Sequence, residues 1–201
     1  MKLQWHQFGC VSIETKTASL VIDPFHNDGS IVMPKLNPQI VALTDLHNEQ
    51  TNNVQRVEKH QPRHIVGPGE YEVEGIFIYG IATQGTTLYC IEADGVAVVH
   101  PGRTQSLTAD QLKFIERCDI LLLPITGADT KTLTNFVSQL EPRIVVPIWC
   151  RPYAASQPKA LDPMEAALKS FGVTEPVPEP RLSLKPSQLP TGDMVVQVLT
   201  P

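Results

Sequence analysis

The sequence predicts an α/β sandwich, in which two sheets pack face to face and helices cover them. In the first half of the 201 residues, short apolar or alternating runs follow one another between turn residues, as in a meander of strands. From residue 108 on, helical patterns alternate with continuous apolar runs. A doubly wound sheet needs that alternation throughout, so the meander argues against it. No internal repeat or flexible linker divides the sequence, and we expect one domain over residues 1–201.

The first half is expected to be almost entirely strands and turns. Gly75 interrupts one apolar run, which indicates a hairpin or a bulge. Ala93-Asp94-Gly95 is a turn signal between two further strands. Residues 54–60 predict one or two helical turns, because Val54 and Val57 are three residues apart. The predicted strands cover residues 11–15, 18–22, 40–43, 63–66, 71–79, 87–92 and 96–100.

In the second half, predicted helices alternate with predicted strands. Thr108 is expected to cap the first helix, and Asp162 the third, with Pro163 at its first position. Two of the strands are continuously apolar, which is typical of strands covered on both faces. The helices cover residues 108–117, 131–140 and 162–171, and the strands cover residues 120–125, 143–148 and 194–199.

Composition excludes several classes of protein. The formal net charge is −5 and the basic residues are scattered, which argues against a nucleic-acid-binding surface. The four cysteines include no Cys-x-x-Cys pair, and three lie in or beside apolar runs, as buried thiols in a reducing compartment do. The sequence opens without a signal-peptide core, and no apolar run reaches membrane-spanning length. We expect a cytoplasmic protein whose partner, a small molecule or a protein, stays open, as does its oligomeric state.

The most informative stretch is residues 40–53, in which an apolar strand leads directly into ligand-capable side chains. Polar residues at the end of a buried strand lie at the edge of a sheet, where metals and substrates are commonly held. This edge is therefore the candidate functional site. The side chains in question are Asp45, His47, Glu49 and Gln50.

Further stretches of the chain match those of a known family in the same order. They are Gly9-Cys10-Val11, Ile13-Glu14, residues 21–25, residues 67–73 with Gly75, residues 89–95, residues 119–124 and residues 140–147. On these stretches the chain resembles the metallo-β-lactamase superfamily, close to its lactonase-like branch of small predicted zinc-dependent hydrolases. The resemblance implies an αββα sandwich with a metal site at one edge, between the two sheets.

The resemblance also locates the family's metal-binding positions, and most of them carry other residues here. The loop 82–86, where the family has a histidine, contains none. Arg103 stands in place of the family's metal-bridging aspartate, and Trp149 in place of its last histidine. The His-x-His-x-Asp-His motif of the family falls on Asp45, His47, Glu49 and Gln50, so that only His47 is kept.

These replacements predict a degenerate metal site. A catalytic zinc site needs about three nitrogen, sulfur or carboxylate ligands and a bound water. A guanidinium repels a cation, and an indole offers only a donor, so Arg103 and Trp149 cannot replace the lost ligands. We expect Trp149 to fill the former site and Arg103 to form an ion pair with Asp45 or Glu49. The interpretation is a non-catalytic binding or scaffolding protein, with no catalytic residue assigned and no cofactor.

Two alternatives remain at this point. In the first, Asp45, His47 and Glu49 alternate on one face and rebuild a site for zinc, manganese or magnesium, which would make the chain a hydrolase of a small ester, lactone or phosphoester. In the second, Cys150 or His100 serves a metal-free enzyme. A histidine at a strand end is more often a hydrogen-bonded structural residue, and a lone cysteine without a basic neighbour has an ordinary thiol pKa.

Overall fold

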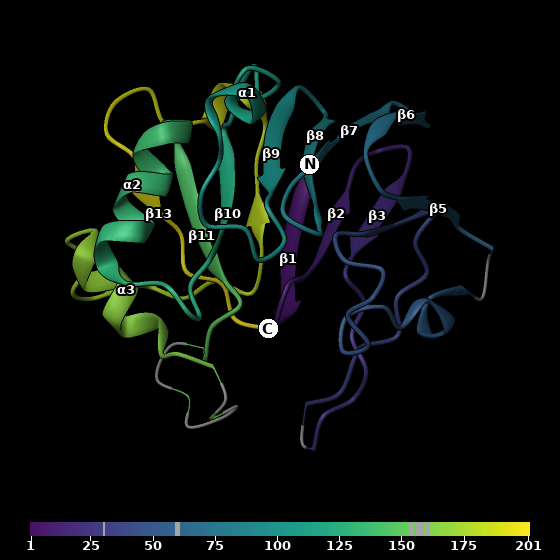
Figure 1. Cartoon of the computed structure of the whole chain (residues 1–201), viewed down its shortest axis with the longest axis horizontal. Helices are drawn as coiled ribbons and strands as arrows, with labels where there is room; N and C mark the ends of the chain where they lie inside the picture. The colour runs from purple at the N-terminus through teal and green to yellow at the C-terminus, as the bar shows by residue number, and fades with distance from the viewer. Residues whose placement is uncertain (30, 59–60, 153–154, 156–158, 160) are drawn as a thin grey trace.

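The computed structural model describes the chain except for residues 30, 59–60, 153–154, 156–158 and 160. The described residues form two sheets that pack face to face (Figure 1). Short apolar strands supply both inner faces, and the core between them contains mainly leucine, isoleucine and valine. This arrangement confirms the α/β sandwich, and in the described residues no helix is long and apolar enough to cross a membrane.

The first sheet has the strand order β12-β1-β2-β3-β4-β5. Strands β3, β4 and β5 are parallel, whereas β12, β1, β2 and β3 pair antiparallel in that order. The carboxyl ends of β3 and β4 therefore lie at the same edge. The strands are β1 (Lys2–Gln7), β2 (Cys10–Glu14), β3 (Ser19–Ile22), β4 (Ile40–Leu43), β5 (Arg63–Val66) and β12 (Leu182–Ser183).

The second sheet has the strand order β13-β11-β10-β9-β8-β7-β6. Strands β6 to β9 form an antiparallel meander, and β9, β10, β11 and β13 are parallel. The carboxyl ends of β9 and β11 thus point to one edge as well. The strands are β6 (Gly69–Val73), β7 (Ile76–Ala82), β8 (Thr87–Ala93), β9 (Val96–His100), β10 (Ile120–Pro124), β11 (Ile144–Ile148) and β13 (Val195–Val196).

Helices α2 (Thr130–Leu140) and α3 (Met164–Ser170) lie on the outer side of the second sheet, next to β10 and β11 (Figure 1). Every residue of β10 and β11 is buried, which confirms that these two strands are covered on both faces. Asp129 caps α2 by accepting a hydrogen bond from the backbone N–H of Thr132. The buried residues of α2 have helical spacing, as the sequence predicts: Leu133, Phe136, Val137 and Leu140.

Several boundaries differ from the sequence prediction. Helix α1 covers only Ala109–Leu112, although Thr108 caps it as predicted. Asp162 does not cap α3, because its carboxylate accepts a hydrogen bond from the backbone N–H of Gly127 instead. The predicted strand at 194–199 shortens to β13, which pairs with only two residues of β11. Strand β1 has no counterpart among the predicted strands.

Two short 3-10 helices complete the described structure. The first, η1 (Val54–Arg56), occupies part of the predicted helical turns at 54–60, of which residues 59–60 lie outside the described part. The second, η3 (Pro186–Gln188), lies in the proline-rich tail. The predicted hairpin around Gly75 is confirmed, because β6 and β7 pair antiparallel on either side of it. All four cysteines are free thiols, as the sequence predicts.

Candidate functional site

Five segments that are distant in the sequence meet at the edge where β3, β4, β9 and β11 end. The turn between β1 and β2 joins them, because Phe8 C=O accepts a hydrogen bond of 2.8 Å from the backbone N–H of Trp149, which follows β11. Thr44, which follows β4, lies 3.0 Å from the place where a Cβ on Gly102 would be. Gly102 follows β9, so this contact joins the first sheet to the second. These contacts hold the strand ends of the two sheets close together at this edge.

Asp23 is a fully buried carboxyl directly after β3, with a φ of 49°. Its two oxygens accept hydrogen bonds from Thr44, one from the backbone N–H at 2.8 Å and one from Oγ1 at 2.6 Å. Burial raises the pKa of Asp23 to about 7, and the hydrogen bonds from Thr44 oppose that shift. The ends of β3 and β4 are therefore joined by a carboxyl that changes its charge near neutral pH.

His100 is fully buried at the end of β9 and joins the two sheets through backbone groups. Its Nδ1 accepts a hydrogen bond from the Gly102 N–H at 3.1 Å, which assigns the ring proton to Nε2. Nε2 then donates to the carbonyl of Gly9 at 2.8 Å. Burial lowers the pKa of His100 to about 4. Both ring nitrogens have backbone partners, which is the arrangement expected of a structural histidine at a strand end.

The side chain of Trp149 fills the centre of this edge. It is only 4% exposed, its φ is 48°, and its ring centroid lies 5.9 Å from that of Phe8. A Cβ on Gly9 would lie 2.5 Å from the indole Nε1, a distance that real Cβ atoms do not reach. Glycine at position 9 is therefore required for the indole to lie where it does. Nε1 is buried and has no hydrogen-bond partner among the described residues.

Arg103 lies over Trp149, with its guanidinium carbon 5.0 Å from the ring centroid. The prediction that Arg103 pairs with Asp45 or Glu49 is wrong: in the described part of the chain it forms no ion pair with either carboxylate. The electron-rich face of the indole attracts the cation instead. Asp45 Oδ1 is engaged elsewhere, because it accepts a hydrogen bond from the backbone N–H of His47.

The remaining predicted positions lie in the loop after β4. Asp45 is half-buried, whereas the side chains of His47, Glu49 and Gln50 are exposed. The loop is built from two Asx turns, in which Asp45 accepts from His47 N–H and Asn48 accepts from Gln50 N–H. These turns interrupt the alternation of side-chain directions that would place Asp45, His47 and Glu49 on one face. Within the part of the chain that the structure describes, no three histidine, cysteine, aspartate or glutamate side chains gather closely enough to hold a metal ion.

The predicted nucleophile Cys150 is fully buried behind Trp149. Burial raises the pKa of its thiol well above the ordinary value, and the neighbouring charge of Glu165 raises it further. A thiolate is the reactive form of cysteine, so a shift in this direction makes Cys150 inert. Burial and this pKa direction argue against Cys150 as a nucleophile in a metal-free enzyme.

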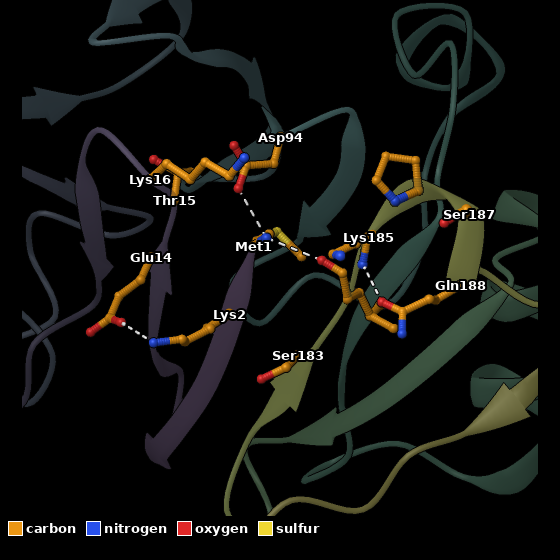
Figure 2. A pocket seen from close by; sticks show the side chains of 12 residues that line it. Met1, Lys2, Glu14, Thr15, Lys16, Asp94, Ser183, Lys185, Ser187 and Gln188 are labelled. Atoms are coloured by element: carbon orange, nitrogen blue, oxygen red, sulfur yellow. Dashed lines mark hydrogen bonds and ion pairs between the residues drawn. The ribbon is translucent and has the colours of Figure 1, made fainter.

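A hollow of about 980 Å³ lies at the opposite end of the strands, beside the β2–β3 and β8–β9 turns. Figure 2 shows that charged groups within it face one another. Lys2 forms an ion pair with Glu14 at 3.7 Å, and the amino group of Met1 pairs with Asp94 at 2.9 Å. None of the predicted site residues lines this hollow. We therefore place the candidate site at the Trp149 edge.

Comparison with known proteins now identifies the family. A sequence model of the beta-lactamase superfamily domain matches residues 2–149. The chain belongs to the metallo-β-lactamase superfamily. A UPF0173 metal-dependent hydrolase from Natranaerobius thermophilus is 23% identical over 184 residues, covering 74% of this chain and 82% of that protein. A second protein of that name, from Bacillus velezensis, is 26% identical over 76 residues, which span only 33% of its length.

Solved structures of the superfamily share the fold. An inferred Zn-dependent hydrolase from Thermotoga maritima has a TM-score of 0.79 and 25% identity, and the alignment covers 100% of both chains. A metallo hydrolase from Ignicoccus hospitalis has a TM-score of 0.65 and 19% identity, covering 92% of this chain and 99% of that one. Metallo-β-lactamase relatives of this chain are thus named as metal-dependent hydrolases.

The sequence located Arg103 and Trp149 at one site, and the structure brings them into contact. It assigned no role at the site to Gly9, Asp23 or Thr44. The signal for Asp23 was available, since an acidic residue directly after an apolar strand is unusual unless it is hydrogen-bonded. Nothing local in the sequence reveals the contact of Gly9 with Trp149, because it joins residues on opposite sheets.

We expect Gly9→Ala to destabilise the fold by about 1–3 kcal/mol, because the new methyl group overlaps the indole of Trp149. Gly192→Ala is the matched control, since a Cβ there meets nothing within 4 Å. Urea unfolding of both variants measures the difference. Equal stability of the two variants would show that Trp149 does not occupy the site.

We expect the pH dependence of unfolding to change in Asp23→Asn. Burial raises the pKa of Asp23 to about 7, so its contribution to stability is complete below the pKa of the unfolded chain and is lost as the pH rises through 7. Between about pH 4 and 7, the wild type should therefore lose stability relative to the variant, by up to about 1.4 kcal/mol per pH unit, with little further change above pH 8. His6 and His100 are present in both proteins, so their titration cancels. A difference that stays constant with pH contradicts the assignment.

Proposed function

We propose that this chain is a non-catalytic binding member of the metallo-β-lactamase superfamily. The observation that carries the proposal is the position of Trp149, whose buried indole fills the edge where the superfamily binds metal. Arg103 closes the same place from the solvent side. Both residues stand at positions where the superfamily has metal ligands. The contact between Arg103 and Trp149 therefore accounts for both replacements.

The donor set at this edge does not fit a divalent ion. Catalytic zinc needs about three ligands and an open position for water. Asp45 and His47 are ligand-capable, but the hydrogen bond from the His47 backbone to the Asp45 carboxylate holds them in a turn. The guanidinium of Arg103 adds a positive charge at this edge, over Trp149, which raises the free energy of any cation bound there. These features support a site that no longer generates hydroxide.

The replacement of the ligands also has a packing rationale. An empty cavity where metal ligands once lay leaves its lining without contacts, and an aromatic ring restores them. A guanidinium over an indole contributes about 0.5–1 kcal/mol at an exposed position. The Trp149–Arg103 pair thus supports a stable edge without metal.

The cysteines of the chain bear on its location. Free buried thiols support a cytoplasmic location.

A metal-dependent hydrolase of a small ester, lactone or phosphoester is the second candidate. It is favoured by the names of the Natranaerobius thermophilus and Thermotoga maritima relatives. Burial and, to a lesser degree, the charge of Asp45 raise the pKa of Asp23, and both residues follow strands that end at this edge. This candidate requires that the loop carrying His47 and Glu49 rearrange to bring them to those carboxyls.

Metal analysis separates the two candidates. We expect protein purified without chelators, and then titrated with zinc and manganese, to bind far less than one equivalent of either metal. His47→Ala should leave this result unchanged, because His47 is exposed and forms no part of a ligand cluster. Stoichiometric binding that His47→Ala abolishes would overturn the proposal and establish the hydrolase reading.

A further inference from the structure

A second cavity, of about 470 Å³, opens beside Arg103 at the same edge. It is bounded by the loop between β7 and β8, the segment 103–108, the start of α1 and the first turn of α2. Its volume lies in the range of cavities that hold small ligands. Hydroxyl and amide side chains dominate its lining, which includes Thr83, Thr86, Thr104, Ser106 and Thr132.

The cavity is electrostatically one-sided. Arg103 is the only charged residue among the described residues that line it, and no carboxylate is among them. Within the described chain, Arg103 also lacks an ion-pair partner elsewhere. The guanidinium lies over the Trp149 ring, and its N–H donors are not paired by any carboxylate of the described residues. A planar fork of donors matches the oxygens of a carboxylate or a phosphate group.

Three threonine hydroxyls hold the two sides of the cavity together. Thr83 Oγ1 lies 2.6 Å from Thr86 Oγ1, and Thr104 Oγ1 donates to Thr83 Oγ1 at 3.1 Å. Thr86 Oγ1 and Thr104 Oγ1 are 3.4 Å apart, which closes the triangle. The loop before β8 is thereby joined to the segment that carries Arg103. Such a connection positions the donors before a ligand arrives, which lowers the entropy cost of binding.

Gln105 and Ser106 also line the cavity. Gln105 is held in place by its Nε2, which donates to the carbonyls of Pro124 and Thr126. The hydroxyl of Ser106 has no protein partner in the described part of the chain, so it can donate to a bound molecule. The lining therefore offers one cationic fork and several neutral hydrogen-bonding groups beside the apolar side chain of Leu107.

We propose that this cavity binds a small hydroxylated molecule that carries an oxyanion, with Arg103 pairing the oxyanion and the threonine and serine hydroxyls contacting the hydroxylated body. The proposal rests on the proposed binding function, to which it adds the class of ligand. A molecule of this class gives the cation at position 103 a role in binding besides its contact with Trp149.

Three matched probes test the proposal by isothermal titration: glycerol phosphate, glycerate and glycerol. We expect at least one of the two anions to bind, and glycerol not to bind at the same concentrations. Which anion binds more tightly distinguishes a phosphate from a carboxylate ligand. Failure of both anions to bind, or equal binding of glycerol, would overturn the proposal.

Substitution of Arg103 connects the binding to the cavity. We expect Arg103→Gln to weaken anion binding by about tenfold or more, because a charge-assisted hydrogen bond is lost. Arg63→Gln is the control, since Arg63 is an exposed cation of β5 outside the cavity. Unchanged binding in Arg103→Gln, with its folding verified by thermal melting, would overturn the proposal. Anion binding that requires added zinc would instead overturn the proposed metal-free function, so the two failures are distinguishable.

Discussion

The contact between the indole of Trp149 and the backbone of Gly9 constrains the whole edge of this molecule. Only glycine leaves room for the ring, and the ring in turn offers its outer face to Arg103. Under the proposed function, the indole takes the space of the superfamily's metal ligands, and the guanidinium adds a positive charge there. A single packing arrangement thus links the shape of the site to its charge. The same arrangement affects the shape and the charge of the neighbouring cavity, because Arg103 lines it.

Around this contact, two buried polar groups join elements that the fold brings together. His100 connects the end of β9 to Gly9 through neutral hydrogen bonds, and Asp23 connects the ends of β3 and β4. Both side chains are fully buried, so their hydrogen bonds fix the positions of the turns with little freedom. In a hydrolase such rigidity would serve to hold ligands. Under the proposed function, the same rigidity positions Trp149, whose backbone N–H donates to Phe8 C=O in the turn that contains Gly9.

Much of the fold could be predicted because its signals are local. The runs of β10 and β11 are continuously apolar, and α2 shows its buried face by spacing alone. The site was only partly predictable. Arg103 and Trp149 were found by their positions in the family pattern, but the partner of Arg103 was not, because an indole competes with carboxylates in a way that spacing does not reveal. Helix α1 is shorter than predicted, because the chain beyond Leu112 continues in tighter turns, in which Ile115 N–H donates to Leu112 C=O.

The most direct measurement of the central claim is a crystal structure from a zinc-containing solution, with diffraction data collected at the zinc absorption edge. We expect density for the indole of Trp149 between Gly9 and the guanidinium of Arg103, and no anomalous peak beside Asp45 and His47. A strong anomalous peak coordinated by those two residues, with the indole displaced from the edge, would contradict the account.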